Sequence, residues 1–380
     1  MLLIKNIEVY SPVKLGVKDV LITNGKVTLM EDEIEAFSPE IKIIDGRGKK
    51  LVPGLIDNHV HITGGGGEGS FRTRVPEIPL SKLIEGGITT VVGLLGTDST
   101  TRSVENLVAK AKALKEEGIS VYAHTGSYGY PSVTITGSVK KDIVFIDEII
   151  GVKIALSDHR APSLTKAELA RLASDARVAG MIAGKAGIVV AHMGDGAEGL
   201  GLINQVLEET EIPIRTIRPT HVNRKQELLA ESFQYAKRGG LIDLTCGLYE
   251  DLSPTNVIAR AEKEGVPLEN ITVSSDGYGS WSKYDEYGNL IKIGASSVSS
   301  LLKELQSMVL NLGWGLEKAL PFFTSNVAKA LNIYPKKGSI SKNNDADLLI
   351  IDDEINLLYV ISKGRVMMED GELIVKGTYE

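Results

Sequence analysis

Short runs of alternating hydrophobic and polar residues indicate β-structure at both ends of the chain. Near the N-terminus, the run 19–22 precedes Asn24-Gly25, and the run 41–44 precedes Asp45-Gly46. Asn-Gly and Asp-Gly between β-prone runs are typical of hairpin turns. The C-terminal part repeats this pattern, with runs 347–352, 357–361 and 373–375 separated by turns at 363–364 and 370–372. We therefore expect one small β-sandwich domain built from residues 1–53 and 336–380.

Between these ends, hydrophobic runs alternate with stretches of helical pattern. The runs lie at residues 51–61, 88–95, 120–125, 151–156, 187–192, 214–221, 240–245 and 271–275, and helical patterns include 104–117, 166–181, 226–238 and 254–264. Eight strands alternating with helices predict a (β/α)8 barrel over residues 54–335. A doubly wound open sheet is the structural alternative. No G-x-G-x-x-G motif follows the first run, which disfavours its dinucleotide-binding form.

Composition narrows the functional classes. The 380 residues are 43% hydrophobic and 24% charged, and the net charge of −7 comes without a basic block, so we expect no nucleic-acid partner. No hydrophobic run approaches the roughly 20 residues of a membrane helix. The first ten residues alternate like a strand and lack the layout of a signal peptide. The sequence therefore predicts a cytoplasmic enzyme or binding protein without a membrane partner. The single cysteine, Cys246, excludes an internal disulfide and leaves histidine and carboxylate as metal ligands.

Polar side chains stand inside or at the ends of five of the predicted barrel strands: His59 and His61, Lys153, His192, His221 and Asp276. Residues two apart on a strand project from the same face, so His59 and His61 can hold one cation. Each residue taken alone has an ordinary structural explanation, such as a hydrogen-bonded histidine or a turn aspartate. The strand ends of a barrel meet at one mouth, however, and together these residues suffice for two metal ions.

Lys153 lies within a hydrophobic run, where burial beside cations would lower the pKa of its amine. A neutral amine can take up carbon dioxide and become a carbamate, a carboxylate-like group that can bridge two metals. The residue type permits this modification without requiring it.

The six strand-end residues, in this order, resemble the amidohydrolase superfamily. The resemblance covers essentially the whole chain and narrows to the isoaspartyl (β-aspartyl) dipeptidase family. It rests on the segments GGGGEG (64–69), VVGLLGTDS (91–99), TITGSVKKD (134–142), GVKIALSDHR (151–160), AHMGD (191–195), PTHVNR (219–224) and SSDGYGS (274–280). Residues 129–130 and 277–278 depart locally from the family pattern, which leaves the preferred leaving residue open.

The resemblance implies a binuclear centre with carbamylated Lys153 as the bridging ligand. One metal would be held by His59, His61 and Asp276, and the other by His192 and His221. Zinc is the expected ion, with cobalt, nickel or manganese as alternatives for such ligands. A metal-bridging hydroxide would attack the β-aspartyl peptide bond, and Asp276 would act as general base and acid. His124 and His159 fall outside this set; we expect a satisfied strand residue and a support for the Arg160 loop.

The resemblance also assigns the substrate contacts. Tyr128 would hydrogen-bond the oxyanion, and Glu68 would hold the α-ammonium group of a β-Asp-X dipeptide. The backbone amide of Gly66 would approach the isoaspartyl group, since glycine lacks a side chain. Thr97 and Ser280 would contact its α-carboxylate. The carboxylate of the leaving residue would be bound by Arg160 and Arg224, a geometry that suits guanidinium groups.

Two alternatives remain beside the dipeptidase. A dihydroorotase or hydantoinase would act on cyclic amides with a similar metal site, but would not need Glu68 opposite two arginines. A non-catalytic scaffold with the same fold would be expected to lose metal ligands, whereas this chain keeps all six. The resemblance further implies a homo-oligomer, with an octamer as one form.

Overall fold

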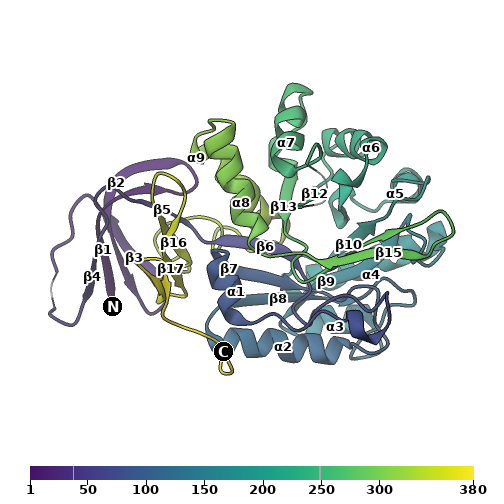
Figure 1. Ribbon diagram of the computed structural model, residues 1–380, viewed down its shortest axis with the longest axis horizontal. Helices are drawn as coiled ribbons and strands as arrows, with labels where there is room; N and C mark the ends of the chain where they lie inside the picture. The colour runs from purple at the N-terminus through teal and green to yellow at the C-terminus, as the bar shows by residue number, and fades with distance from the viewer. Residues whose placement is uncertain (37, 248–249) are drawn as a thin grey trace.

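The computed structural model describes residues 1–36, 38–247 and 250–380. Figure 1 shows a small sheet that combines the purple N-terminal strands with the yellow C-terminal strands, beside a larger body of parallel strands and helices. This arrangement confirms the predicted fold class: a barrel-like parallel sheet and a separate sheet made from both chain ends. The domain boundaries at residues 53/54 and 335/336 stay predictions.

The small sheet is mixed and, among the described residues, contains nine strands in the order β19-β18-β17-β16-β5-β1-β2-β3, with β4 paired to β1. Its buried core consists of aliphatic side chains such as Ile4, Val20, Leu348 and Ile361. The strands are β1 (Leu2–Tyr10), β2 (Lys14–Thr23), β3 (Lys26–Glu31), β4 (Lys42–Asp45), β5 (Lys50–Pro53), β16 (Leu348–Ile351), β17 (Leu357–Ser362), β18 (Arg365–Glu369) and β19 (Glu372–Leu373).

Three of the predicted turns connect antiparallel strands, and a fourth does not. Asn24-Gly25 connects the antiparallel strands β2 and β3, and both of its residues have the positive φ angles, 49° and 74°, that this turn requires. Lys363-Gly364 and Asp370-Gly371 likewise connect antiparallel pairs. The hairpin expected at Asp45-Gly46 is wrong. Strands β4 and β5, on either side of it, both pair in parallel with β1, so long-range pairing determines that geometry.

The large sheet places eight parallel strands in sequential order, from β6 to β13. A parallel bridge between Val60 and Gly277 brings its two edges together, which gives the near-closed barrel. The strands are β6 (Leu55–Val60), β7 (Ile88–Gly93), β8 (Ser120–Gly126), β9 (Ile149–Leu156), β10 (Ile188–Met193), β11 (Ile217–Thr220), β12 (Ile242–Thr245) and β13 (Ile271–Ser274).

The first hydrophobic run, residues 51–61, is not one strand. It divides at Gly54 into β5, in the small sheet, and β6, the first barrel strand. A Cβ atom at Gly54 would lie 2.1 Å from Thr89 Oγ1, so only glycine permits this close crossing between the two sheets. The chain thus passes directly from the small sheet into the strand that carries His59.

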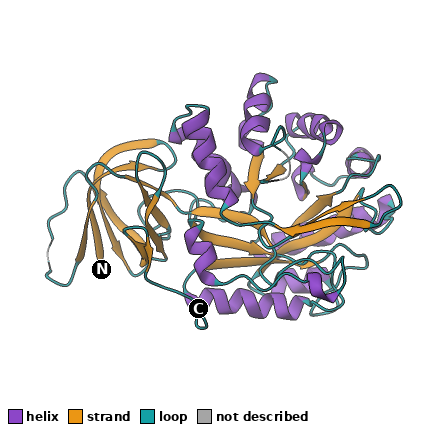
Figure 2. Ribbon diagram, in the orientation of Figure 1, coloured by secondary structure: helices purple, strands orange, loops and turns teal. Residues whose placement is uncertain are grey.

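Helices surround the barrel strands, as the purple ribbons of Figure 2 show. Among the described residues, no helix is long and hydrophobic enough to cross a membrane. The α-helices are α1 (Leu80–Glu85), α2 (Val104–Glu117), α3 (Val139–Phe145), α4 (Lys166–Ala183), α5 (Gly201–Glu209), α6 (Gln226–Lys237), α7 (Pro254–Lys263), α8 (Ser300–Gln306), α9 (Leu316–Ala319) and α10 (Ser325–Ala330). Shorter helical turns are η1 (Phe71–Thr73), η2 (Ile214–Thr216), η3 (Val222–Arg224), η4 (Leu268–Asn270), η5 (Ser307–Asn311) and η6 (Leu320–Phe323), and a separate hairpin consists of β14 (Ser280–Tyr284) and β15 (Leu290–Ala295).

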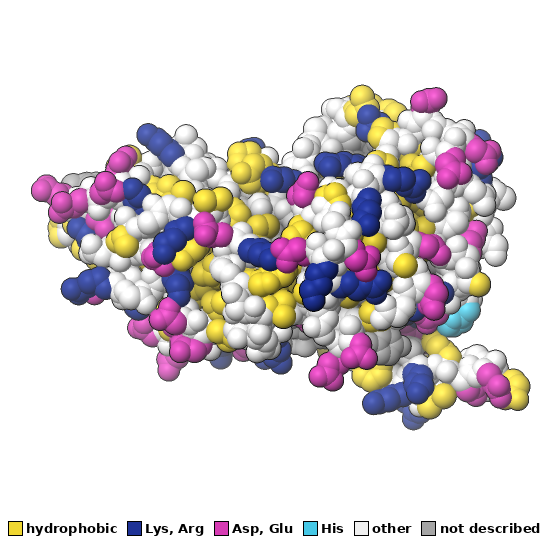
Figure 3. Space-filling view, turned by 90° about the horizontal axis from the view of Figure 1, so that it is seen from above, with side chains coloured by type: hydrophobic (Ala, Val, Ile, Leu, Met, Phe, Trp, Pro, Cys, Tyr) yellow, Lys and Arg dark blue, Asp and Glu magenta, His cyan; other side chains and the backbone are white. Residues whose placement is uncertain are grey.

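Acidic and basic side chains are interspersed over the face of the molecule seen in Figure 3. This mixture agrees with the moderate net charge of −7. The N-terminal end of the barrel is closed by a hydrophobic cluster in which Ile56, Ile188 and Val190 pack with Val327 and Leu331 near α10. The polar side chains predicted for the site lie at the opposite end, where the strands finish.

Buried Lys337 links the two sheets, and its replacement by methionine is expected to destabilise the protein by about 3–5 kcal/mol. Its Nζ donates to Ser120 Oγ at 2.7 Å at the start of β8, and also contacts Asp347, next to β16. Without the ammonium, the buried carboxylate of Asp347 would have no cation. Urea unfolding of both proteins measures the difference. A loss below about 1 kcal/mol, the size expected of an exposed ion pair, would contradict this role.

Candidate metal centre and substrate pocket

The six predicted strand-end residues meet at the C-terminal mouth of the barrel. Their side chains all lie on or just beyond barrel strands and are buried or nearly so. They come from β6 and the residue after it, from β9 and β10, and from the loops after β11 and β13: His59, His61, Lys153, His192, His221 and Asp276.

Short distances connect the side chains of this group to one another. Lys153 Nζ lies 3.0 Å from His59 Nε2. The His221 ring lies between two other imidazoles, with its centroid 4.7 Å from that of His59 and 4.6 Å from that of His192. The ligand atoms of His59, His221 and Asp276 all lie within 4.8 Å of one another, so these three could hold one metal ion.

Asp276 Oδ1 faces two imidazole nitrogens, at 3.2 Å from His61 Nε2 and 3.5 Å from His59 Nε2. Within the described part of the chain, Oδ1 is buried without a hydrogen-bond partner, and so is the other ring nitrogen of His61. A proton on one ring would serve only one of these contacts. A divalent cation would accept lone pairs from Asp276 Oδ1, His61 Nε2 and His59 Nε2 at once, so this donor set fits a metal ion.

Burial keeps the imidazoles in the form that binds metals. It lowers the pKa of His59, His192 and His221 well below the usual value, and the Lys153 charge lowers all three further. These side chains are therefore neutral at physiological pH, as metal ligation requires. Burial also lowers the pKa of Lys153 to about 7, so a substantial fraction of this amine is unprotonated at neutral pH.

Two of the six residues adopt left-handed backbone conformations, with φ angles of 61° at His221 and 51° at Asp276. Such angles are uncommon for residues other than glycine and are concentrated at functional sites. Both residues follow the end of a strand, and the turn redirects each side chain into the barrel mouth. The backbone therefore supports the interpretation drawn from the side chains.

A pocket of about 820 Å³ opens above the mouth and reaches His61, His192 and Asp276. Its walls also include every residue that the sequence predicted for substrate contacts: Gly66, Glu68, Thr97, Tyr128, Arg160, Arg224 and Ser280. The hairpin β14–β15 forms one side, through residues such as Trp281 and Lys292. The structure thus places predicted ligands and predicted substrate contacts around one cavity.

The glycine run after β6 forms part of this wall because the chain there passes close to its own backbone. Gly66 has a φ angle of 81°, and a Cβ atom on it would lie 2.3 Å from the carbonyl oxygen of Thr73. No other residue fits that position without moving the loop. The run is therefore a close-packed turn that presents Glu68 to the pocket.

Glu68 is the centre of a polar cluster in the pocket. Its Oε1 accepts hydrogen bonds from Ser280 Oγ at 2.8 Å and Thr97 Oγ1 at 3.2 Å, and lies 3.4 Å from Arg160 Nη1. Its Oε2 is buried and has no hydrogen-bond partner among the described residues. A buried carboxylate oxygen without a donor is costly, so the site is suited to a ligand that brings one, such as an ammonium group.

Tyr128, Asp158 and Arg160 form a second cluster beside His192. The hydroxyl of Tyr128 lies 2.8 Å from His192 Nδ1, and Asp158 Oδ2 lies 3.1 Å from His192 Nε2. Asp158 also accepts two hydrogen bonds from the Arg160 guanidinium, at 2.9 and 2.8 Å. Two of the Arg160 nitrogens are engaged in this way, and the third, Nη1, lies 3.4 Å from Glu68 Oε1. Arg224 is freer: its Nε has no hydrogen-bond partner among the described residues and faces Asp195 Oδ1 at 3.7 Å.

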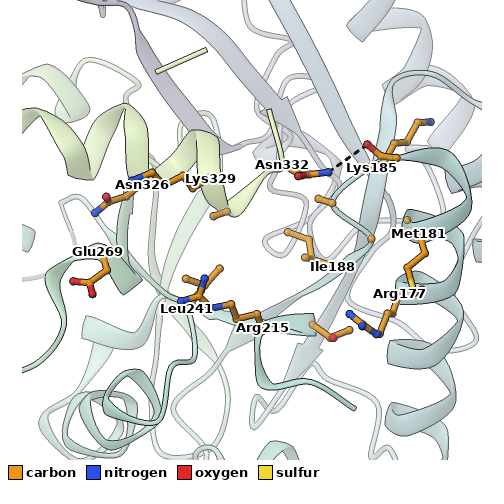
Figure 4. A pocket seen from close by; sticks show the side chains of 16 residues that line it. Arg177, Met181, Lys185, Ile188, Arg215, Leu241, Glu269, Asn326, Lys329 and Asn332 are labelled. Atoms are coloured by element: carbon orange, nitrogen blue, oxygen red, sulfur yellow. Dashed lines mark hydrogen bonds between the residues drawn. The ribbon is translucent and has the colours of Figure 1, made fainter. Parts of the chain in front are cut away.

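A second cleft, of about 540 Å³, lies at the opposite end of the barrel, where the strands begin (Figure 4). Arg177, Lys185, Arg215 and Lys329 line it, with Glu269 on one side. Lys185 already donates to the carbonyl oxygens of Ile143 and Ile146 at 2.7 and 2.6 Å. None of the clustered histidines reaches this cleft, so the candidate chemistry belongs to the other end.

The comparison with protein families agrees with the geometry. The model of the amidohydrolase family matches residues 51–373, which is most of the chain. The chain belongs to the amidohydrolase family. The match begins in β5 and ends in β19, so this amidohydrolase includes strands of the small sheet as well as the barrel.

Among solved structures, this amidohydrolase is similar over its whole length to the β-aspartyl dipeptidase of Fervidobacterium islandicum AW-1, solved in complex with a β-Asp-Leu dipeptide. The two share 45% identity over 98% of each chain, with a TM-score of 0.92. The D-hydantoinase of Thermus sp. covers 99% of this chain and 97% of its own with a TM-score of 0.70, but at 17% identity it shows only the common fold.

Among curated relatives, the dihydroorotase of Listeria monocytogenes serotype 4a (strain HCC23) is 35% identical over 150 residues, which is 38% of this chain. The match spans about a third, 34%, of the dihydroorotase. This shared segment agrees with membership of the amidohydrolase family and leaves the rest of the dihydroorotase unmatched.

The sequence did not identify Asp158, or the β14–β15 hairpin on one side of the pocket, as parts of the site. Asp158 lies just after β9 and two residues before Arg160, and a carboxylate so close to a predicted site residue was the signal in the sequence. The contact of Asp158 with His192 arises only in the folded barrel. His159 does support its loop, since its Nδ1 lies 3.6 Å from Asp158 Oδ1 and its ring packs edge-on against Tyr284 at 4.7 Å. His124 is not the satisfied strand residue that we expected. Both of its ring nitrogens are buried without a hydrogen-bond partner among the described residues.

Proposed function

We propose that this chain hydrolyses the β-aspartyl peptide bond of dipeptides at a centre of two divalent cations. The observation that carries the proposal is Glu68, whose buried Oε2 has no partner among the described residues and shares a pocket with the imidazole and carboxylate cluster. A free α-ammonium near the scissile bond distinguishes a β-aspartyl dipeptide from a cyclic amide. The 45% identity with a β-aspartyl dipeptidase over 98% of each chain supports the same substrate.

His59, His61 and Asp276 would hold one cation, and His192 and His221 the other, with Lys153 between them. Zinc is the ion we expect, and cobalt suits the same ligands. When bound, such ions polarise a carbonyl group and lower the pKa of water to near neutrality. One ring nitrogen of His192 would bind the cation in place of its contact with Tyr128 at Nδ1 or Asp158 at Nε2, and the other contact would hold the ring. Ligands fixed in this way keep their orientation.

Lys153 would join the centre as a carbamate. Its neutral amine attacks carbon dioxide, the new N–C bond forms, and one proton leaves to solvent, which gives a Lys-NH-COO⁻ group. The conversion of a cation into an anion suits a position 3.0 Å from His59 and surrounded by metal ligands. Burial, which lowers the pKa of the amine to about 7, makes this reaction accessible at neutral pH.

Asp276 and Tyr128 would act on the reacting atoms. The carboxylate of Asp276 lines the pocket and can take a proton from the attacking water, then deliver it to the leaving amine. Burial raises the pKa of Tyr128, so the phenol keeps its proton and can donate it in a hydrogen bond to the developing oxyanion.

Substrate recognition would follow from charge. Glu68 would bind the α-ammonium, while Thr97, Ser280 and the backbone amide of Gly66 would contact the isoaspartyl head. Arg224, with Nη1 of Arg160, would bind the carboxylate of the leaving residue. The dipeptide is the partner this pocket supports, and assembly into a homo-oligomer, with the octamer as one form, is part of the same proposal.

Competing substrates test the assignment. Metal-replete protein should hydrolyse β-Asp-Leu at least about 100-fold faster, in kcat/KM, than dihydroorotate or a hydantoin. An unpaired Glu68 would face those cyclic amides, and a buried polar group left unpaired rejects a substrate strongly. The sequence match to dihydroorotases makes the cyclic amide the second candidate function. Faster turnover of the cyclic amide would replace the proposed function with that one.

Substitution of Glu68 by glutamine should raise KM for β-Asp-Leu and lower kcat/KM by about 10- to 100-fold, the size of a lost charge-assisted hydrogen bond. Steady-state kinetics on β-Asp-Leu and on its N-acetylated form measure the effect. The variant should lose its preference for the free amine. Glu77→Gln is the control, because Glu77 lies on the same segment with its side chain 46% exposed, beside Lys110. An unchanged preference in Glu68→Gln would contradict the ammonium contact.

A further inference from the structure

Arg218, on barrel strand β11, is an unpaired buried cation. Its side chain is completely buried, and none of its three guanidinium nitrogens has a hydrogen-bond partner among the described residues. A guanidinium group does not lose its proton in a protein. Burial of an ion without a partner costs several kcal/mol. A hydrogen-bond acceptor that the chain itself does not supply is therefore expected next to Arg218.

Arg102 shows how this chain satisfies a buried arginine when its role is structural. Its side chain is also buried, and its guanidinium donates to the carbonyl oxygens of Thr63, Gly65 and Val75. The lengths to Gly65 and Val75 are 3.1 and 2.8 Å. Backbone acceptors thus balance Arg102, and among the described residues Arg218 has no equivalent set.

Asp243 is the candidate counter-ion for Arg218, but its carboxylate accepts hydrogen bonds from other residues. Its Oδ1 accepts hydrogen bonds from Thr272 and Asn58, at 2.5 and 3.1 Å. Its Oδ2 accepts from Ser274 and Thr220, at 2.7 and 2.8 Å. Four neutral donors therefore occupy this carboxylate, and among the described residues no Arg218 nitrogen is bonded to it. The Asp243 charge acts on Arg218 only over a distance.

A second unpaired group lies close to Arg218. His124, on β8, is completely buried with both ring nitrogens unpartnered among the described residues. Apart from burial, the Arg218 charge is the strongest influence that lowers its pKa, and a weaker contact with the Gly151 backbone raises it. The ring is therefore neutral and keeps one N–H donor. Gly151, beside it on β9, has no side chain; a Cβ atom there would lie 2.9 Å from His124 Nδ1.

The register of the barrel places these groups near the level of Lys153, which belongs to the candidate metal centre. Lys153, Val190 and Arg218 are paired across β9, β10 and β11, and His124 pairs with Gly151, two residues before Lys153. Arg218 is close enough for its charge to lower the pKa of Lys153. The inside of the barrel at this level therefore offers N–H donors from Arg218 and His124, and no hydrogen-bond acceptor is paired with them among the described residues.

We propose that the barrel interior binds one small monovalent anion of the halide class, held between the guanidinium of Arg218 and the N–H of His124. A halide is a single atom that accepts several hydrogen bonds without directional preference. It would also neutralise the guanidinium charge, which water cannot do. In a cell, chloride is the abundant member of this class. The site is separate from the substrate pocket, whose lining includes neither Arg218 nor His124.

Bromide tests the proposal directly, because it replaces chloride and can be located by anomalous scattering. Crystals of the full metal-loaded protein, soaked in sodium bromide, should give an anomalous peak at the bromine edge within about 3.5 Å of the Arg218 guanidinium, a charge-assisted contact to a large ion. This measurement uses the wild-type chain and does not depend on activity. Density that fits only ordered water, or bromide peaks confined to surface sites, would overturn the proposal.

Thermal unfolding supplies a second test in solution. An anion that binds only the folded state raises the unfolding midpoint as its concentration increases. The wild-type midpoint should be higher in sodium chloride than in sodium gluconate at equal ionic strength, since gluconate is too large for a buried site. Arg218→Met should lose this difference. Arg215→Met is the control, because Arg215 is exposed and donates to Gly239 O and Asn270 Oδ1, both at 3.1 Å. Equal wild-type midpoints in the two salts would contradict the proposal.

Discussion

Replacement of Lys153 by alanine is expected to reduce β-Asp-Leu hydrolysis by about 10³-fold, within the range that loss of a central catalytic group produces. Lys153 is completely buried at the centre of the ligand group, 3.0 Å from His59 Nε2. Alanine removes the only group that can become the bridging carbamate. The metal content of the purified variant, measured by plasma mass spectrometry, should fall below two ions per chain.

Chemical rescue separates a bridging role from a packing role. Formate, acetate or propionate should restore part of the activity of Lys153→Ala in the presence of added zinc, because a free carboxylate can occupy the place of the carbamate. Lys185→Ala is the matched control: Lys185 also has a pKa lowered by burial, but it donates to carbonyl oxygens at the other end of the barrel. That variant should keep its activity and respond to no carboxylate. Undiminished activity in Lys153→Ala would contradict the bridging role.

Replacement of Asp276 by asparagine should lower kcat for β-Asp-Leu by about 10³-fold while KM changes little. The amide keeps one oxygen for a metal ion but cannot accept a proton at neutral pH. Steady-state kinetics measure kcat and KM. Metal analysis of the same preparation then distinguishes lost proton transfer from lost metal.

Asp195→Asn is the control for Asp276. Asp195 also lines the pocket, with its side chain 72% exposed and 3.7 Å from Arg224, so its replacement should change kcat by less than about threefold. Equal effects of the two substitutions, or a wild-type kcat in Asp276→Asn with full metal content, would remove Asp276 from the proton-transfer role.

The sequence predicted the barrel mouth well because parallel strands end together. His192, His221 and Asp276 are far apart along the chain, yet each stands at the end of a hydrophobic run. Once the runs are counted as barrel strands, their C-terminal residues have to meet. The assembly of Glu68 with Thr97 and Ser280 is different, because it depends on loops and was expected only from the family resemblance.

The errors arose where long-range packing overrides a local signal. Asp45-Gly46 is a good hairpin sequence, but β1 pairs with the strands on both sides of it. The run 51–61 reads as one strand, and the close approach of Thr89 to Gly54 divides it between two sheets. Asp158, which links Arg160 to His192, carries no pattern that identifies its partners. The lack of partners for the Arg218 and His124 nitrogens within the described part of the chain becomes visible only when the barrel strands are placed side by side.

The central claim is that the pocket recognises the isoaspartyl linkage, and the most direct test compares two isomers. Metal-replete protein should be assayed with β-Asp-Leu and α-Asp-Leu, which have the same composition and charge and differ only in the position of the peptide bond. Glu68 and the cation ligands line one cavity at fixed positions, so we expect only one isomer to place its ammonium and its scissile carbonyl together. We expect kcat/KM to favour β-Asp-Leu by about 100-fold or more. Equal rates for the two isomers would contradict the account.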